Sequence, residues 1–130
     1  MTTTTATIKT FEEACAKLGL DPANLPDFSM MPEKHRAALT AHSKLIIIAE
    51  ALNDGWQPDW SNDDEYKYWP YFEITADKDQ PSGFGFSLTG FVRWYTYASV
   101  GSRLCYSSRE LARYAGETFV DLYRAYFLIS

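Results

Sequence analysis

The sequence has few of the residues on which most metal-binding and catalytic sites depend. Its 130 residues include only two cysteines and two histidines, with no Cys-x-x-Cys pair and no Gly-x-Ser-x-Gly motif. Structural zinc sites are built from closely spaced Cys and His ligands, and many serine hydrolases carry their nucleophile in a Gly-x-Ser-x-Gly turn. We therefore expect a protein that is not an enzyme and that needs neither a metal nor another cofactor.

Basic residues and long apolar runs are also scarce. The formal net charge is -5, whereas proteins held by a phosphate backbone cluster Lys and Arg. The longest apolar run, residues 45–49, is far shorter than a membrane helix. The first ten residues, MTTTTATIKT, lack the basic start and apolar stretch of a signal peptide. We expect no membrane association and a cytoplasmic location.

The two cysteines lie far apart in the sequence and do not form a pair typical of metal or redox sites. Cys15 falls on the apolar face of a predicted helix, and Cys105 lies between Leu104 and Tyr106. In a cytoplasmic chain of this length such cysteines are usually reduced, buried thiols. Both are therefore predicted to be unbridged and buried.

A short helix is predicted near the N-terminus. Thr10 and Glu13 have the spacing of a capping box, in which each side chain accepts a hydrogen bond from the other's backbone N–H. Gly19 suits the left-handed residue that ends a helix. Residues 1–8 are Thr-rich and without periodicity, so we expect a disordered tail there, followed by a single domain over residues 9–130.

Two long helices are predicted further along the chain. The first extends from Pro32 to about Asn53, and it is apolar around so much of its circumference that a central position is expected. The second begins with a capping box formed by Ser107 and Glu110 and continues as one helix to about Tyr126.

The region between the long helices is rich in β-favouring and aromatic residues. Glycine- and serine-containing turns divide it into short segments, which favours antiparallel neighbours. The predicted strands are residues 70–75, 84–88, 91–98 and 103–106, with a turn at Thr89-Gly90. The predicted fold is α+β: a short antiparallel β-meander of three to four strands packed against two long helices and one short N-terminal helix.

An acidic and aromatic segment, WQPDWSNDDEYKYWPYF at residues 56–72, precedes the strands. Asp59, Ser61 and Asp63 have the oxygen spacing of a calcium loop, but Asp64 stands where such a loop needs glycine and Pro70 where it needs a carboxylate. A solvated acidic turn with Asx caps is the better interpretation. We expect the loop of residues 56–60 to fold back over the sheet and the central helix, because its large rings need cover.

The aromatic residues of this segment and of residues 91–98 leave three interpretations open. They are core, a protein-contact surface, or a platform for bases or sugars, in which arginines supply positive charge beside the stacking rings. The candidate binding residues are Trp56, Trp60, Arg93, Tyr95, Tyr97 and Arg103.

Two stretches carry a resemblance to a known family. They are AEALNDGWQPDWSN at residues 49–62, continuing into YKYWPYF at 66–72, and VGSRLCYSSRELARYAG at residues 100–116. Together they resemble an uncharacterised family of short proteins from phage and prophage gene sets of gut bacteria, over roughly residues 40–128. The resemblance implies a phage or mobile-element context and little about mechanism. Because the family has no established activity, no catalytic residues can be carried over from it.

The composition and the resemblance together lead to a functional hypothesis. We predict a non-enzymatic, phage- or mobile-element-associated module that acts through protein–protein contacts or self-association, in the host cytoplasm or in a virion. The alternative is a nucleic-acid-binding accessory protein that uses the aromatic strand and nearby arginines.

Overall fold

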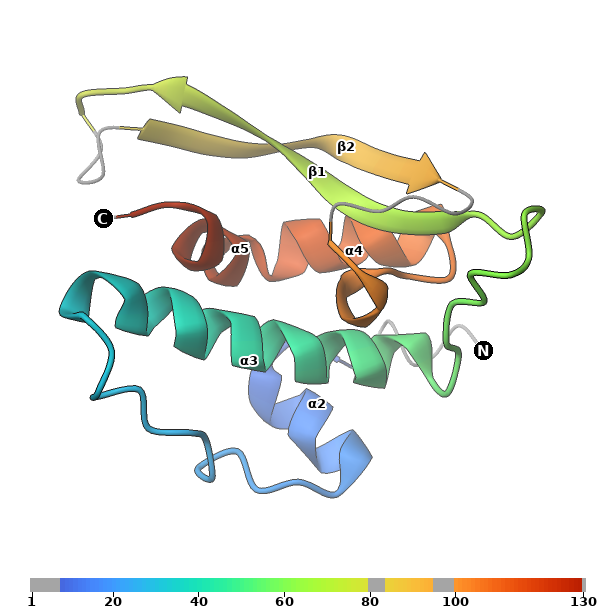
Figure 1. Ribbon diagram of the computed structural model, residues 1–130, viewed down its shortest axis with the longest axis horizontal. Helices are drawn as coiled ribbons and strands as arrows, with labels where there is room; N and C mark the ends of the chain where they lie inside the picture. Colours follow the sequence, from blue (N-terminus) through green and yellow to red (C-terminus); the bar gives the residue numbers. More distant parts are fainter. Residues whose placement is uncertain (1–7, 80–83, 95–99, 130) are drawn as a thin grey trace.

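The computed structural model describes residues 8–79, 84–94 and 100–129. Its elements, in chain order, are α2 (Phe11–Leu18), α3 (Glu33–Asn53), β1 (Lys67–Ala76), β2 (Phe84–Trp94), the 3-10 helix η1 (Ser102–Leu104), α4 (Arg109–Thr118) and α5 (Val120–Phe127). The β hairpin lies on a layer formed by α4 and α5, α3 lies beneath that layer, and α2 packs on the far side of α3 (Figure 1). The prediction of an α+β fold is confirmed.

Helix α2 forms as its capping residues predict. Thr10 Oγ1 accepts a hydrogen bond from Glu13 N–H at 3.1 Å, and Glu13 Oε1 accepts one from Thr10 N–H at 3.2 Å. Gly19 ends the helix at φ 73°. Ile8, which the predicted boundary assigns to the tail, is instead buried in the core, and its carbonyl accepts a hydrogen bond from the Tyr114 hydroxyl at 2.6 Å.

Helix α3 is the central helix, as predicted. It begins after Pro32 and ends where Asp54 adopts a left-handed conformation with φ 52°. Helix α2 packs against one side and α5 against another, which accounts for its broad apolar surface. Its buried residues are Ala41, Leu45, Ile48, Ala49, Ala51 and Leu52.

The predicted meander is wrong: the described residues form one two-stranded antiparallel sheet. The segment Thr89-Gly90 is part of β2 and not a turn. Tyr71 pairs with Gly90 whereas Phe72 pairs with Leu88, so Thr89 is an extra residue in β2 and forms a bulge. Residues 84–88 and 91–98 are predicted as separate strands. Residues 84–94 are instead one continuous strand, and residues 95–98 lie outside the described residues.

The predicted strand at residues 103–106 is also wrong. Gly101, at φ 74°, leads the chain into η1. Only Tyr106 pairs with the sheet: it forms an isolated antiparallel bridge with Tyr68, through N–H···O bonds of 3.1 and 2.6 Å.

The single C-terminal helix is divided into α4 and α5, and its cap is one residue later than predicted. Ser108 Oγ accepts the Leu111 N–H at 3.2 Å. The Ser107 N–H, which the predicted capping box would pair with the Glu110 side chain, instead donates to Asn53 Oδ1 at 3.1 Å. The break falls at Phe119, with φ -113° and ψ 30°.

The break follows from the different neighbours of the two helices. Helix α4 packs closely on the sheet at Gly116, where an added Cβ would lie 2.8 Å from Leu88 Cδ1 and 3.0 Å from Pro70 Cβ. Helix α5 packs mainly against α3. A straight helix would have to satisfy both surfaces at once.

A buried aromatic cluster joins the hairpin to α5. The Phe72 ring stacks on Phe86 with centroids 4.5 Å apart and lies 5.0 Å from the Tyr123 ring. The hydroxyls of Tyr106 and Tyr123 are 3.1 Å apart, and burial raises the pKa of both phenols. None of the described helices combines the length and the apolar character needed to cross a bilayer.

Candidate functional site

The loop between α3 and β1 lies at one end of the molecule, beside η1 (Figure 1). Two Asx turns shape it. Asp59 Oδ1 accepts hydrogen bonds from Ser61 N–H at 3.0 Å and Ser61 Oγ at 2.6 Å, and Asn62 Oδ1 accepts one from Asp64 N–H at 2.9 Å. The Ser61 donors hold the pKa of the Asp59 carboxyl below its usual range. The predicted acidic turn with Asx caps is confirmed.

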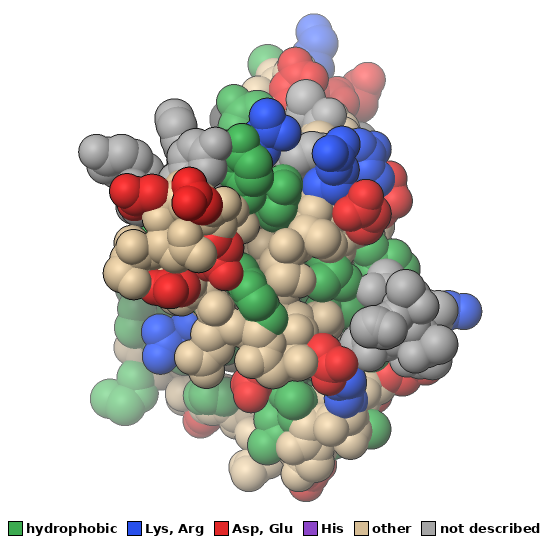
Figure 2. All heavy atoms as spheres, turned by 90° about the vertical axis from the view of Figure 1, so that its right-hand side faces the viewer, with side chains coloured by type: hydrophobic (Ala, Val, Ile, Leu, Met, Phe, Trp, Pro, Cys, Tyr) green, Lys and Arg blue, Asp and Glu red, His purple; other side chains and the backbone are tan. Residues whose placement is uncertain are grey.

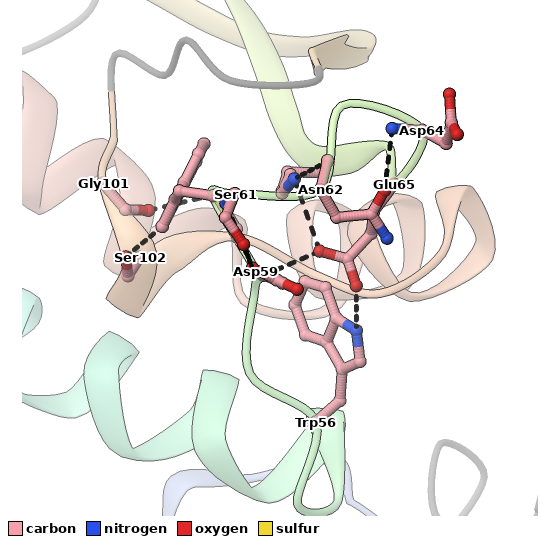
Figure 3. Close-up of polar contacts among 11 residues, drawn as sticks. Trp56, Asp59, Ser61, Asn62, Asp64, Glu65, Gly101 and Ser102 are labelled. Carbon is pink, nitrogen blue, oxygen red and sulfur yellow. Dashed lines mark hydrogen bonds and ion pairs between the residues drawn. The ribbon is translucent and has the colours of Figure 1, made fainter.

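The Glu65 carboxylate connects the two ends of this loop (Figure 3). Its Oε2 accepts a hydrogen bond from Trp56 Nε1 at 3.2 Å, and its Oε1 accepts one from Asp59 N–H at 2.8 Å. Oε1 also lies 3.4 Å from Lys67 Nζ. One carboxylate therefore fixes an indole, a turn and the first residue of β1.

Lys67 is completely buried, which is rare for a lysine. Its Nζ donates to the Asn62 carbonyl at 3.1 Å and lies 5.1 Å from the centroid of the Trp60 ring. A buried ammonium needs such partners, because water cannot solvate it. Sequence reasoning assigned Lys67 no role, although it is the only basic residue between residues 56 and 72. A single lysine among several carboxylates is the feature of the sequence that could have indicated a paired, buried role for Lys67.

Two further hydrogen bonds join the loop and the end of α3 to the segment around η1. Trp60 Nε1 donates to Ser102 Oγ at 2.6 Å, and Asn53 Nδ2 donates to the Cys105 carbonyl at 2.9 Å. Trp56 and Trp60 are each half-buried. The loop therefore contacts η1 through Trp60 and the first residue of β1 through Glu65 and Trp60. Its expected position over the sheet and the central helix stays a prediction.

The two cysteines are buried and unbridged, as predicted. Burial raises the pKa of the Cys15 thiol, and it raises that of Cys105 to about 12. The Cys105 thiol donates to the Gly101 carbonyl at 3.0 Å. Because the thiolate is the reactive form, neither thiol is suited to act as a nucleophile near neutral pH.

A cleft of about 390 Å³ separates α3, the loop and η1. We call it the end cleft. A second hollow of about 370 Å³ is lined in part by the same residues, Glu50, Trp56 and Gln57, so the two hollows adjoin. The residues that line the end cleft are Ile46, Glu50, Asn53, Trp56, Gln57, Pro58, Ser102 and Arg103.

Three of the predicted binding residues meet at the end cleft. Trp56 and Arg103 line it, and Trp60 Nε1 donates a hydrogen bond to the lining residue Ser102. The lining side chains offer one indole, one guanidinium, one carboxylate, two amides and one hydroxyl. This set suits the recognition of a ligand that carries both apolar and polar groups.

The other predicted binding residues are Arg93, Tyr95 and Tyr97, and Arg93 is not among those that line the end cleft. The Arg93 guanidinium lies over the Tyr66 ring, 4.8 Å from its centroid. Tyr95 and Tyr97 lie outside the described residues. Figure 2 views this end of the molecule and shows acidic and basic side chains interspersed, with no single large basic patch on the described part of the face.

The histidines lie away from the end cleft. His42 stacks on Tyr126, with ring centroids 4.6 Å apart, and it precedes Glu50 on α3 by about 12 Å of helix rise. Within residues 8–79, 84–94 and 100–129, no three His, Cys, Asp or Glu side chains are grouped as metal ligands would be.

A scan of protein-family models, a search of curated proteins and a search of solved structures each gave no match for this chain. The resemblance to a phage family therefore stays a prediction. In the structure the two stretches that carry it meet, because residues 49–62 and 100–116 are joined by the Trp60–Ser102 and Asn53–Cys105 hydrogen bonds.

Proposed function

We propose that this protein is a non-enzymatic binding module, associated with a phage or another mobile element, that recognises a partner protein through the end cleft. The observation that carries the proposal is that the Trp56 indole, which lines the cleft, is held by Glu65, whose carboxylate in turn contacts the buried Lys67. The phage context is supported by the sequence resemblance alone.

A fixed wall favours recognition. Ordering a flexible loop on binding costs free energy, so a loop held in place beforehand leaves more of the contact energy for affinity. Glu65 already holds the Trp56 indole, and Arg103 lines the same cleft. Tryptophan and arginine are the side chains that most often dominate protein–protein binding energy.

The charges around the cleft favour a polypeptide over a nucleic acid. Glu50 and Arg103 give the lining one charge of each sign, and a peptide supplies donors and acceptors along its backbone for such a mixed surface. The exposed Asp59, Asp63 and Asp64 lie in the adjoining loop and would repel phosphates.

The protein-contact proposal is tested with a charge reversal in the cleft and a matched one outside it. Arg103→Glu removes the guanidinium of the lining. Lys34→Glu is the control, because Lys34 is exposed at the start of α3, about 24 Å of helix rise before Glu50. Tagged wild-type and variant proteins are used to capture partners from producing cells, and the affinity of each purified partner is then measured.

We expect Arg103→Glu to weaken binding of a partner at least about ten-fold, as expected for a hot-spot residue. Lys34→Glu should leave the affinity unchanged. Equal binding by both variants, or equal loss in both, contradicts the proposal.

One observation supports the alternative of a nucleic-acid-binding accessory protein. Arg93 and Arg103 are both exposed. Single-stranded DNA or RNA bound through them should lose affinity steeply as salt is raised. Salt-dependent binding that is lost in both Arg93→Glu and Arg103→Glu would favour this alternative and contradict the protein-contact proposal.

A further inference from the structure

The outer edge of β1, the edge away from β2, is hydrogen-bonded at Tyr68 and, in the described part of the chain, open further along the strand. Tyr68 exchanges two backbone hydrogen bonds with Tyr106 on the side away from β2. In an antiparallel strand every second residue directs its N–H and C=O to the same side, so Phe72, Ile74 and Ala76 also direct theirs away from β2. Among the described residues, no backbone hydrogen bond outside the hairpin is made at these three positions.

Pro70 separates the closed part of this edge from the open part. It falls on the same alternation as Tyr68 and would direct its backbone nitrogen outwards, but proline has no N–H to donate. Proline is tolerated at such an edge position, and it prevents regular pairing from continuing through it. The open part of the edge therefore begins after Pro70.

The open part carries exposed apolar side chains. Tyr71 is 55% exposed and Ile74 is 50% exposed, and residues 73–76 are all exposed. Figure 1 shows this end of the hairpin projecting at the left, with β1 as the strand further from the helices. An open strand edge with apolar side chains is a template for pairing with another strand.

We propose that this edge pairs with the same edge of a second copy of the chain, antiparallel about a two-fold axis at Ile74, so that two hairpins form one four-stranded sheet. Such an isologous contact is the commonest way in which identical subunits associate. Ile74 then lies opposite Ile74 of the second copy, and Phe72 lies opposite Ala76. The proposal goes beyond the proposed function, because it uses the hairpin and not the end cleft.

The charges along β1 select this register. An axis at Glu73 would place that carboxylate opposite itself, and an axis at Thr75 would place Glu73 opposite Asp77. Like charges directly opposite each other destabilise a strand pair. An axis at Phe72 would require a donor from Pro70. With the axis at Ile74, Glu73 lies opposite the neutral Thr75, and the two half-exposed isoleucines cover each other.

The first measurement is the molar mass of the wild-type protein as a function of concentration, by light scattering or sedimentation. We expect the mass to rise from 14.8 kDa towards twice that value. A monomer at every concentration overturns the proposal.

The second measurement compares Thr75→Lys with Thr75→Glu, which alter one exposed side chain and leave the hairpin intact. In the proposed register the lysine faces Glu73 of the second copy and tightens the dimer, whereas the glutamate faces the same carboxylate and weakens it. Because symmetry makes the contact twice, each shift should be about 2- to 30-fold in the dissociation constant. Equal effects, or effects of the opposite sign, overturn the register.

The third measurement uses Ile74→Pro, which removes an outward N–H but no hydrogen bond between β1 and β2. We expect a folded monomer, with its circular dichroism spectrum confirming the fold. A dimer that survives this change overturns the proposal.

Arg103→Glu, in the end cleft, should leave the dimer intact. If this change disrupts the dimer, the copies associate through the end cleft instead, and the proposal is overturned. An error in the dimer proposal and an error in the proposed function of the end cleft would thus give different results.

Discussion

Replacing Lys67 with methionine removes the buried charge that holds the loop between α3 and β1. Methionine has a similar length and apolar stem, so most of the packing around the side chain is kept. What is lost is the Nζ contact with Glu65 Oε1 at 3.4 Å, the hydrogen bond to the Asn62 carbonyl at 3.1 Å and the position over the Trp60 ring.

The loss in free energy of unfolding depends on how much solvent and how many hydrogen bonds the Glu65 carboxylate keeps once Lys67 is replaced. Removing one partner of a buried ion pair costs about 3–5 kcal/mol, because the other charge is left uncompensated. Here the Glu65 side chain is 24% exposed and keeps its hydrogen bonds from Trp56 Nε1 and Asp59 N–H. We therefore expect Lys67→Met to lower the free energy of unfolding by about 2–3 kcal/mol, below or at the lower end of that range.

The assay is urea unfolding, in which the midpoint should fall while the slope stays unchanged. The control is a double-mutant cycle with Glu65→Gln. If the two side chains interact, the double variant should be more stable than the sum of the single changes implies, by at least about 1 kcal/mol. The reasoning is refuted if Lys67→Met stays within about 0.5 kcal/mol of wild type, the level of an ordinary surface change.

Three further predictions concern packing and ionisation. Gly116→Ala should destabilise the protein by about 1–2 kcal/mol in urea unfolding, because overpacking against Leu88 outweighs the helix propensity gained; a more stable variant would contradict the close contact. A thiol reagent at pH 8 should modify Cys15 and Cys105 in the native protein only as fast as it unfolds, and rapid labelling would show that they are accessible. The free energy of unfolding should fall as the pH rises above about 9, because unfolded thiols ionise from 9.0 upwards whereas folded Cys105 stays protonated until about 12. A stability that stays level between pH 8 and 10.5 would contradict that assignment.

The helix ends could be predicted where neighbouring residues decide them. The capping box of Thr10 and Glu13 and the left-handed Gly19 depend only on residues within one short segment. The limits of α3 follow from Pro32 and from the chain reversal after Asn53 for the same reason. Such local chemistry is visible in the sequence before any tertiary contact is known.

The errors arose where distant residues decide the outcome. Thr89-Gly90 has turn chemistry, yet pairing with β1 carries the strand through it and absorbs the extra residue as a bulge. Ser107 has capping chemistry, yet Asn53, far away in the sequence, takes its N–H. The burial of Lys67 likewise depends on a loop that folds around it. A periodicity or spacing argument cannot supply these long-range partners.

Photo-crosslinking at the end cleft tests the proposed recognition of a protein most directly. A photo-reactive amino acid is introduced in place of Gln57, which is exposed and lines both hollows, and in a control variant in place of Lys34. After irradiation of cells that produce the protein, we predict a defined protein adduct from position 57 and none of that mass from position 34. The same adducts from both positions, or adducts at position 57 with nucleic acid alone, would contradict the proposed function.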